Sequence, residues 1–114
     1  AALDVLKKKG GEKWVVMGDM KELGRLSDKY HFEAGKQMKD AGVDRLFTVG
    51  EKGAQIGSGF QGLTEHFTDN ENLISRILEI SMKSEVDINL LVKGSRAMHL
   101  EAVVGALLIS EVSQ

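Results

Sequence analysis

The sequence contains no cysteine and no proline, and no stretch of it is long and apolar enough to cross a membrane. The absence of cysteine excludes disulfides, thiolate nucleophiles, zinc ribbons and iron–sulfur clusters, and it weakly favours a reducing compartment. A membrane helix needs about 20 apolar residues, and the first residues lack the basic start and apolar stretch of a signal peptide. We therefore expect a cytoplasmic protein with no membrane partner.

The chain also lacks an excess of either charge. Its 114 residues include 17 acidic and 15 basic side chains, which leaves a net charge of −2. Proteins that bind nucleic acid usually carry a basic excess, so we expect no nucleic-acid partner.

The composition is that of an ordinary globular domain, with 42% hydrophobic and 28% charged residues. No linker, repeat or low-complexity segment divides the sequence, so we interpret residues 1–114 as a single domain. The first residue is alanine and not methionine, which suggests that this domain is part of a longer polypeptide.

Short continuous runs of apolar residues predict strands that are buried on both faces. Three such runs, 14–17, 46–49 and 88–92, combine aliphatic residues with β-branched or aromatic ones. A fourth run, 65–68, is weaker and fits an edge strand.

Helical patterns flank these strands. We expect a helix over residues 1–9, because lysines and then glycines end the segment. A second helix is expected from Ser27 or Asp28, either of which can cap it, to about residue 41, where Gly42 follows.

Two further helices are expected in the second half of the chain. Thr68 and Glu71 have the spacing of a capping box, and the helix that follows would bury Leu73, Ile74, Ile77 and Leu78 on one face. The last helix would be capped by Ser95, and its apolar face would consist of Leu100, Val103, Val104, Leu107 and Leu108.

Apolar strands that alternate with helices predict a parallel sheet, because parallel neighbours must be joined by crossovers. The expected fold is a Rossmann-like, three-layer α/β domain with a mostly parallel sheet and helices on both faces. Ligands bind such sheets beyond the carboxyl ends of the strands, so the loops that follow the strands are the places to look for a site.

A polar loop bounded by glycines, 18–24, follows the first strand and places Asp19 at the carboxyl end of that strand. Acidic residues in this position can accept hydrogen bonds from ribose hydroxyls or hold a cation. An aspartate in a turn can also bond its own backbone. The sequence leaves both uses of Asp19 open.

Two cations and a hydroxyl surround the start of the last helix, where Lys93, Ser95 and Arg96 follow the final strand. Cations are unfavourable at a helix N-terminus, whose free N–H groups attract anions, so an anionic ligand would explain them. The alternative is that Ser95 is only a cap and both cations are solvated. By contrast, the opposite charges in the loop 50–53 are typical of surface decoration.

The remaining motifs point to no further site. His31 can approach the cleft from the start of a helix, although a lone histidine there is more often structural. No two histidines have metal-ligand spacing, so we expect no transition-metal site. The segment 57–62 matches G-x-G-x-x-G but leads into a strand, and the pair at 35–36 resembles a P-loop ending but lies within a helix.

The segments 16–24 and 91–98, together with Ser27 and His31, resemble the C-terminal domain of the bacterial Mur ligases. The similarity covers essentially the whole chain, including residues 41–46, and it is greatest to the members that add D-alanyl-D-alanine. The resemblance implies an enzyme of three domains: one that holds a UDP-sugar, a central ATPase, and a Rossmann-like domain that closes over the site. This chain matches the third.

The resemblance also implies a reaction in peptidoglycan precursor synthesis. ATP phosphorylates the peptide carboxylate of UDP-N-acetylmuramoyl-tripeptide, and the amine of D-alanyl-D-alanine displaces the phosphate. ATP and magnesium would be bound mainly by the central domain. Asp19 would contact the adenosine ribose, Lys93, Ser95 and Arg96 would line the dipeptide pocket, and His31 would lie near the same cleft. No catalytic acid or base is expected in this chain, which alone would turn over no ATP.

Two alternatives accompany this interpretation. The chain could belong to another ligase of the same superfamily that uses a different amino acid. It could also be a stand-alone binding module, such as a receiver-like domain with Asp19 as phospho-acceptor and Lys93 as its partner. A receiver should supply further acids beside Asp19 and a proline after the lysine, where Gly94 stands.

Overall fold

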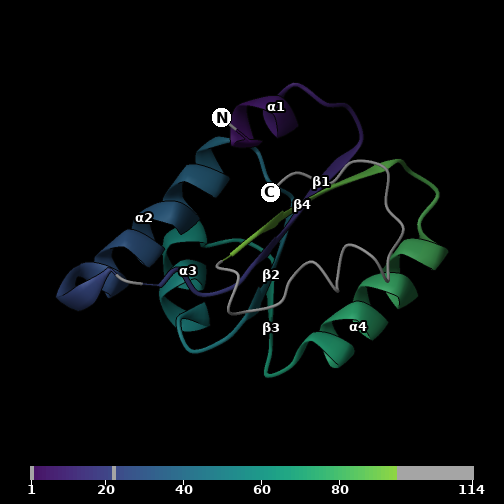
Figure 1. Ribbon diagram of the computed structural model, residues 1–114. Coiled ribbons are helices and arrows are strands. Elements are labelled where there is room, and N and C mark those ends of the chain that lie inside the picture. Colours follow the sequence, from purple (N-terminus) through teal and green to yellow (C-terminus); the bar gives the residue numbers. More distant parts are fainter. Residues whose placement is uncertain (1, 22, 95–114) are drawn as a thin grey trace.

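The computed structural model describes residues 2–21 and 23–94, which form a parallel sheet between layers of helices (Figure 1). The four strands described are β1 (Glu12–Met17), β2 (Arg45–Val49), β3 (Thr64–Phe67) and β4 (Ile88–Lys93). Their order is β3-β2-β1-β4, and all neighbours are parallel. The predicted Rossmann-like α/β fold is confirmed, and the weak run at 65–68 forms an edge strand as expected.

Helices cover both faces of the sheet. α1 (Ala2–Lys7), α2 (Ser27–Asp40) and α3 (Gly53–Phe60) lie on one face, and α4 (Asn70–Lys83) lies on the other (Figure 1). A short 3-10 helix, η1 (Gly24–Leu26), leads into α2. The chain moves from β1 through β2 to β3 and then returns past β1 to β4. Because such crossovers are right-handed, the return connection places α4 on the opposite face.

Alternate side chains of β1 enter the two layers of the core. Trp14 and Val16 pack toward α4, and Val15 and Met17 pack toward α2 and α3. All four are at most 1% exposed. A strand buried on both faces is apolar throughout, which is why its continuous apolar run identified it.

Two glycines bring α2 and α3 into close contact. A Cβ on Gly35 would overlap the carbonyl oxygen of Ile56, and a Cβ on Gly59 would overlap that of Phe32. The glycine-rich segment 57–62 lies at the end of α3, ahead of β3, and Gly35 lies within α2. Both segments therefore have the structural context that the sequence predicted, 57–62 ahead of a strand and Gly35 within a helix.

The predicted helix caps were partly wrong. Ser27 and Asp28 lie inside the first turn of α2, which follows η1 without a side-chain cap. Asp69, and not Thr68, caps α4 by accepting a hydrogen bond of 2.8 Å from the amide of Asn72. The cap therefore lies one residue later than predicted, and the spacing of apolar residues does not resolve a difference of one residue.

The predicted apolar face of α4 was correct for three of its four residues. Leu73 and Ile77 are fully buried and Ile74 packs against them, but Leu78 is 37% exposed. The expected last helix lies outside the described residues. Within the described ranges, no helix is long and apolar enough to cross a membrane.

Candidate functional site

The carboxyl ends of β1 and β4 meet where the strand order reverses. Met17 is paired with Lys93 at the end of this ladder, and the amide of Gly18 donates a 2.9 Å hydrogen bond to the carbonyl of Lys93. In open α/β sheets, the crevice at such a reversal is where ligands bind. The fold therefore brings Asp19, which follows β1, and Lys93, which ends β4, to the same part of the sheet edge.

Asp19 is 5% exposed, and its carboxylate binds the loop that follows β2. Its oxygens accept hydrogen bonds from the amide of Glu51 at 3.0 Å and from the amide of Lys52 at 2.9 Å. These amides lie just ahead of α3, where the positive end of the helix dipole favours a negative charge. Asp19 thus stabilises the start of a helix more than 30 residues away, a contact that the sequence did not predict.

The loop 50–53 is also tied to α2. The ammonium of Lys52 lies 2.7 Å from the carboxylate of Asp28, and this hydrogen bond raises the pKa of Lys52 above its usual value. The charges of this loop were expected to be surface decoration, and Lys52 does form an exposed ion pair, which connects this loop to α2. The sequence placed Lys52 in a loop that follows a strand, but nothing in the sequence identified Asp28 as its partner.

His31 is fully buried under the loop that carries Asp19. Its Nε2 accepts a hydrogen bond of 2.9 Å from the amide of Met20. Its Nδ1 lies 2.7 Å from the carbonyl oxygen of Ser27 and 3.3 Å from the hydroxyl of the same residue. Both ring nitrogens are therefore occupied by groups of this chain, as expected of a buried polar side chain.

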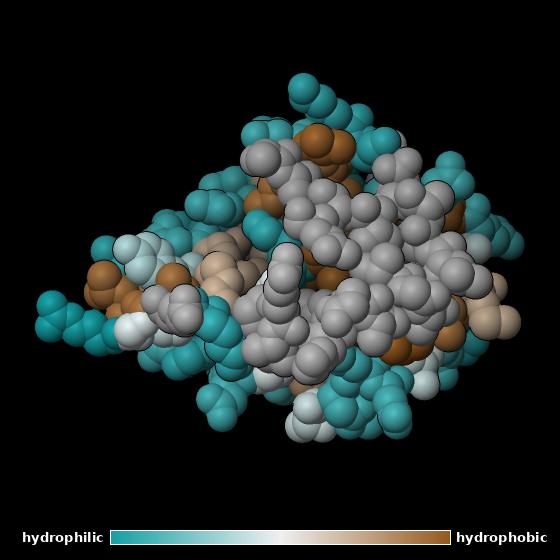
Figure 2. Space-filling view, in the orientation of Figure 1, coloured by the Kyte–Doolittle hydropathy of each residue, from teal (hydrophilic) through white to brown (hydrophobic). Residues whose placement is uncertain are grey.

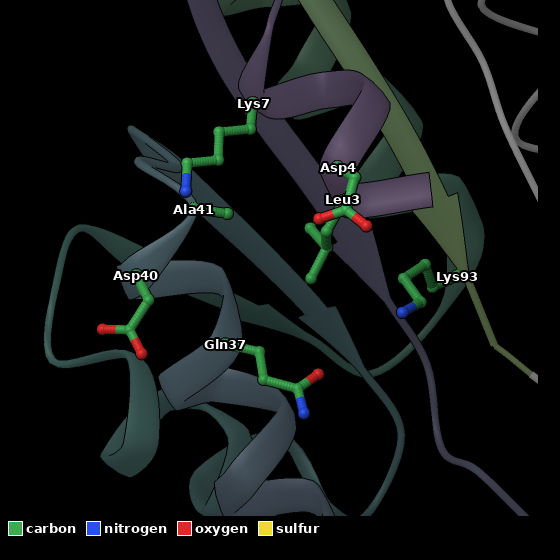
Figure 3. Close-up of a pocket in the computed structure, with 7 residues that line it drawn as sticks. All are labelled: Leu3, Asp4, Lys7, Gln37, Asp40, Ala41 and Lys93. Atoms are coloured by element: carbon green, nitrogen blue, oxygen red, sulfur yellow. The ribbon is translucent and has the colours of Figure 1, made fainter. Parts of the chain in front are cut away.

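Lys93 is half-buried and lines a cavity of about 300 Å³ between α1 and α2. Figure 3 shows its ammonium directed into the space beside Leu3 of α1, with Gln37 of α2 on the other side. The other residues that line the cavity are Asp4, Lys7, Asp40 and Ala41. Asp19 does not line this cavity, so the two predicted site residues share a sheet edge but not a pocket.

The other predicted ligands lie beyond the region that can be described. Ser95 and Arg96 are outside it, so their predicted role is untested. Within residues 2–21 and 23–94, no group of three or more histidine, aspartate or glutamate side chains could hold a metal ion.

Apolar side chains are exposed close to the loop after β1. Leu26 of η1 and Tyr30 of α2 are 45% and 46% exposed. Figure 2 shows apolar atoms among hydrophilic ones at the end of the molecule where η1 and α2 begin.

Parallel strands in this order, with polar residues at the point of reversal, define the class of Rossmann-like α/β domains that bind ligands at the sheet edge. Residues 1–96 match the family model described as Mur ligase, glutamate ligase domain. The chain belongs to this family, and the resemblance seen in the sequence is confirmed.

Known relatives agree with this assignment. The chain is 41% identical over 107 residues to the UDP-N-acetylmuramoyl-tripeptide–D-alanyl-D-alanine ligase of Escherichia coli (strain K12), covering 94% of this chain and 23% of that protein. It is 35% identical to the enzyme of the same name from Bacillus subtilis (strain 168), covering 90% of this chain and 23% of that protein. The chain thus spans about a quarter of the length of these relatives.

Solved structures show the same fold. A crystal structure of MurF from Acinetobacter baumannii matches with a TM-score of 0.83 and 28% identity, covering 95% of this chain and 24% of that one. A MurF ligase from Thermotoga maritima, solved in complex with ADP, matches with a TM-score of 0.67 and 22% identity, covering 93% of this chain and 24% of that one. The second likeness supports the fold alone.

Proposed function

We propose that this chain is the C-terminal domain of an ATP-dependent amide ligase of the cytoplasm. The enzyme joins D-alanyl-D-alanine to UDP-N-acetylmuramoyl-tripeptide in the synthesis of peptidoglycan precursors. The observation that carries the proposal is the 41% identity to the E. coli ligase, which extends over 94% of this chain. An identity that covers the strands, the loops after them and the helices together supports a shared site as well as a shared fold.

In the proposed reaction, the γ-phosphoryl group of ATP passes to the peptide carboxylate and ADP leaves. The amine of D-alanyl-D-alanine then attacks the acyl carbon, an amide bond forms, the C–O bond to phosphate breaks, and the amine loses a proton. Magnesium, held by the rest of the enzyme, supports the phosphoryl transfer. This chain contributes by holding ligands in place, because proximity alone can supply much of the acceleration.

This function assigns two ligand contacts to residues at the carboxyl edge of the sheet. Asp19 faces the adenosine ribose through the lone pairs that its two backbone contacts leave free. Lys93, with Ser95 and Arg96, binds the terminal carboxylate of the dipeptide, for which an arginine offers two parallel hydrogen bonds and a lysine a point charge. Lys93 is half-buried and its ammonium is directed into a cavity (Figure 3), which supports this assignment.

The receiver-like alternative has little support in the geometry. A receiver needs further acidic side chains beside the phospho-acceptor to hold a metal ion, but among the described residues Asp19 belongs to no group of three or more acidic or histidine side chains that could do so. Incubation with acetyl phosphate should therefore leave no phospho-aspartate detectable by mass spectrometry.

The test is a panel of amino acceptors offered to the longer polypeptide that contains this domain, with UDP-N-acetylmuramoyl-tripeptide, ATP and magnesium. We expect phosphate release with D-alanyl-D-alanine and little with D-glutamate, L-lysine or meso-diaminopimelate. A preference for a single amino acid over the dipeptide would assign the chain to another ligase of the superfamily.

The pocket assignment has its own test. Arg96→Ala in that enzyme should raise the KM for D-alanyl-D-alanine more than the KM for ATP, because it removes a contact to the dipeptide only. Equal increases in both KM values would count against the assignment.

A further inference from the structure

We infer that His31 is a positioning residue that acts through the loop after β1 and touches no substrate. The inference deepens the proposed function, on which it rests for the identity of the ligands. The resemblance placed His31 near the dipeptide cleft, and the structure shows a defined set of hydrogen bonds for it within this chain.

The hydrogen bonds of His31 determine which ring nitrogen carries the proton. A backbone amide can only donate, so the 2.9 Å contact with Met20 requires an unprotonated Nε2. The proton of the neutral ring is then on Nδ1, where it is donated to the carbonyl oxygen of Ser27 at 2.7 Å. Because the ring is completely buried, no substrate atom reaches it in this conformation.

The contact to Met20 fixes the peptide group that directly follows Asp19. Asp19 in turn holds the amides of Glu51 and Lys52, and the ammonium of Lys52 returns to Asp28 of α2. Asp28 and His31 lie three residues apart on α2, which is about one helical turn. The contacts therefore form a closed ring, which we call the α2 ring: His31, Met20, Asp19, Lys52 and Asp28.

A closed ring has a consequence that a single hydrogen bond lacks. Loss of the His31–Met20 contact releases the loop that carries Asp19, and this loosens the amides that Asp19 holds at the start of α3. The α2 ring thus couples the loop after β1 to the loop after β2, and the two present one preorganised edge to a ligand.

A matched pair of variants separates the contact to Met20 from the rest of the side chain. In His31→Gln, the amide oxygen reaches about as far as Nε2 and can accept from Met20. In His31→Asn, the amide reaches only the position of Nδ1, so the Met20 amide is left unpaired. Lys36→Gln, on an exposed position of the same helix, is the control.

The first readout is NMR on this chain. The ring ¹⁵N signals should show the proton of His31 on Nδ1. Hydrogen exchange at the amides of Met20, Glu51 and Lys52 should be at least tenfold faster in His31→Asn than in His31→Gln, with Lys36→Gln unchanged. A proton on Nε2, equal exchange in the Gln and Asn variants, or faster exchange confined to Met20 would overturn the inference.

The second readout is kinetics of the longer ligase. His31→Asn should raise the KM for ATP about tenfold, because it frees the loop that carries Asp19, while His31→Gln restores it and the KM for D-alanyl-D-alanine stays the same. Equal KM values for ATP in both variants would contradict the positioning role. If the enzyme uses no dipeptide at all, the proposed function fails, while the exchange measurement still decides the α2 ring.

Discussion

Asp19 shows how much one side chain at the sheet edge can hold in place. Its carboxylate accepts two backbone amides from a loop on the neighbouring strand while it is almost completely buried. Asp19→Asn leaves one of those amides facing an NH₂ group, and each hydrogen bond to a charged group contributes about 1.5–3 kcal/mol. We expect the free energy of unfolding of this chain in urea to fall by about 1–3 kcal/mol.

The matched control for this change is Asp40→Asn, which alters an exposed carboxylate on α2. Such surface substitutions usually change stability by less than about 0.5 kcal/mol. Equal effects of the two substitutions would show that Asp19 does not hold the start of α3.

Lys52 provides a prediction for alkaline pH. The hydrogen bond that the ammonium of Lys52 donates to the carboxylate of Asp28 raises the pKa of Lys52 above its usual value of 10.5. A raised pKa means that the contact stabilises the fold below the unfolded-state pKa and that this contribution is lost as the pH rises through the folded-state pKa. Asp28→Asn should return the pKa of Lys52 toward its usual value, as measured by NMR titration of the side chain. A pKa that does not move would contradict the pairing.

At the level of single residues, the sequence predicted positions better than partners. Asp19 and Lys93 were expected at the carboxyl ends of strands, and both are there. The partners of Asp19 lie 32 and 33 residues away in the chain, and no local pattern specifies a contact over that distance. The role of Lys52 was missed for the same reason, because its contact to Asp28 depends on how α2 and α3 pack.

Among the elements, the contact between α2 and α3 is close enough to require glycine at two positions. Gly35→Ala and Gly59→Ala would each place a methyl group against the backbone of the other helix. Overpacking of this kind destabilises by about 1–3 kcal/mol and occasionally more. We expect a loss of this size for each variant in urea or thermal unfolding.

Gly57 in α3 provides the control within the same helix. A Cβ there would lie 3.6 Å from the side chain of Thr64, which is an ordinary contact. Alanine is favoured over glycine in a helix by about 0.5–1 kcal/mol, so Gly57→Ala should stabilise the chain by that amount. Destabilisation by all three substitutions would show that the contact between the helices is not the cause.

Most of the described elements followed from the pattern of apolar residues, but the short helices η1 and α3 did not. The three strong apolar runs became β1, β2 and β4, but no bounds were predicted for α3. This helix contains three glycines, Gly53, Gly57 and Gly59, and glycine is a poor helix former. Its stability comes from packing on α2, which is a tertiary effect that a sequence pattern does not reveal.

For the whole molecule, the account predicts a domain that folds but does not catalyse. The described residues provide no group of metal ligands, and this chain spans only 23% of its E. coli relative. We expect the isolated chain to show a cooperative unfolding transition and no magnesium-dependent release of phosphate from ATP, with or without the tripeptide and the dipeptide. Turnover of ATP by this chain alone would contradict the proposal that the rest of the enzyme binds ATP and magnesium.

The central claim is that this domain works as part of a D-alanyl-D-alanine-adding ligase. The most direct measurement is to isolate the polypeptide that carries this sequence from its source cells, with an antibody to the chain, and to assay it with the tripeptide, ATP and D-alanyl-D-alanine. We predict a polypeptide about four times as long as this chain, since the chain is 23% of its E. coli relative, and phosphate release that requires the dipeptide. A polypeptide no longer than this chain, or one that releases no phosphate in response to the dipeptide, would contradict the claim.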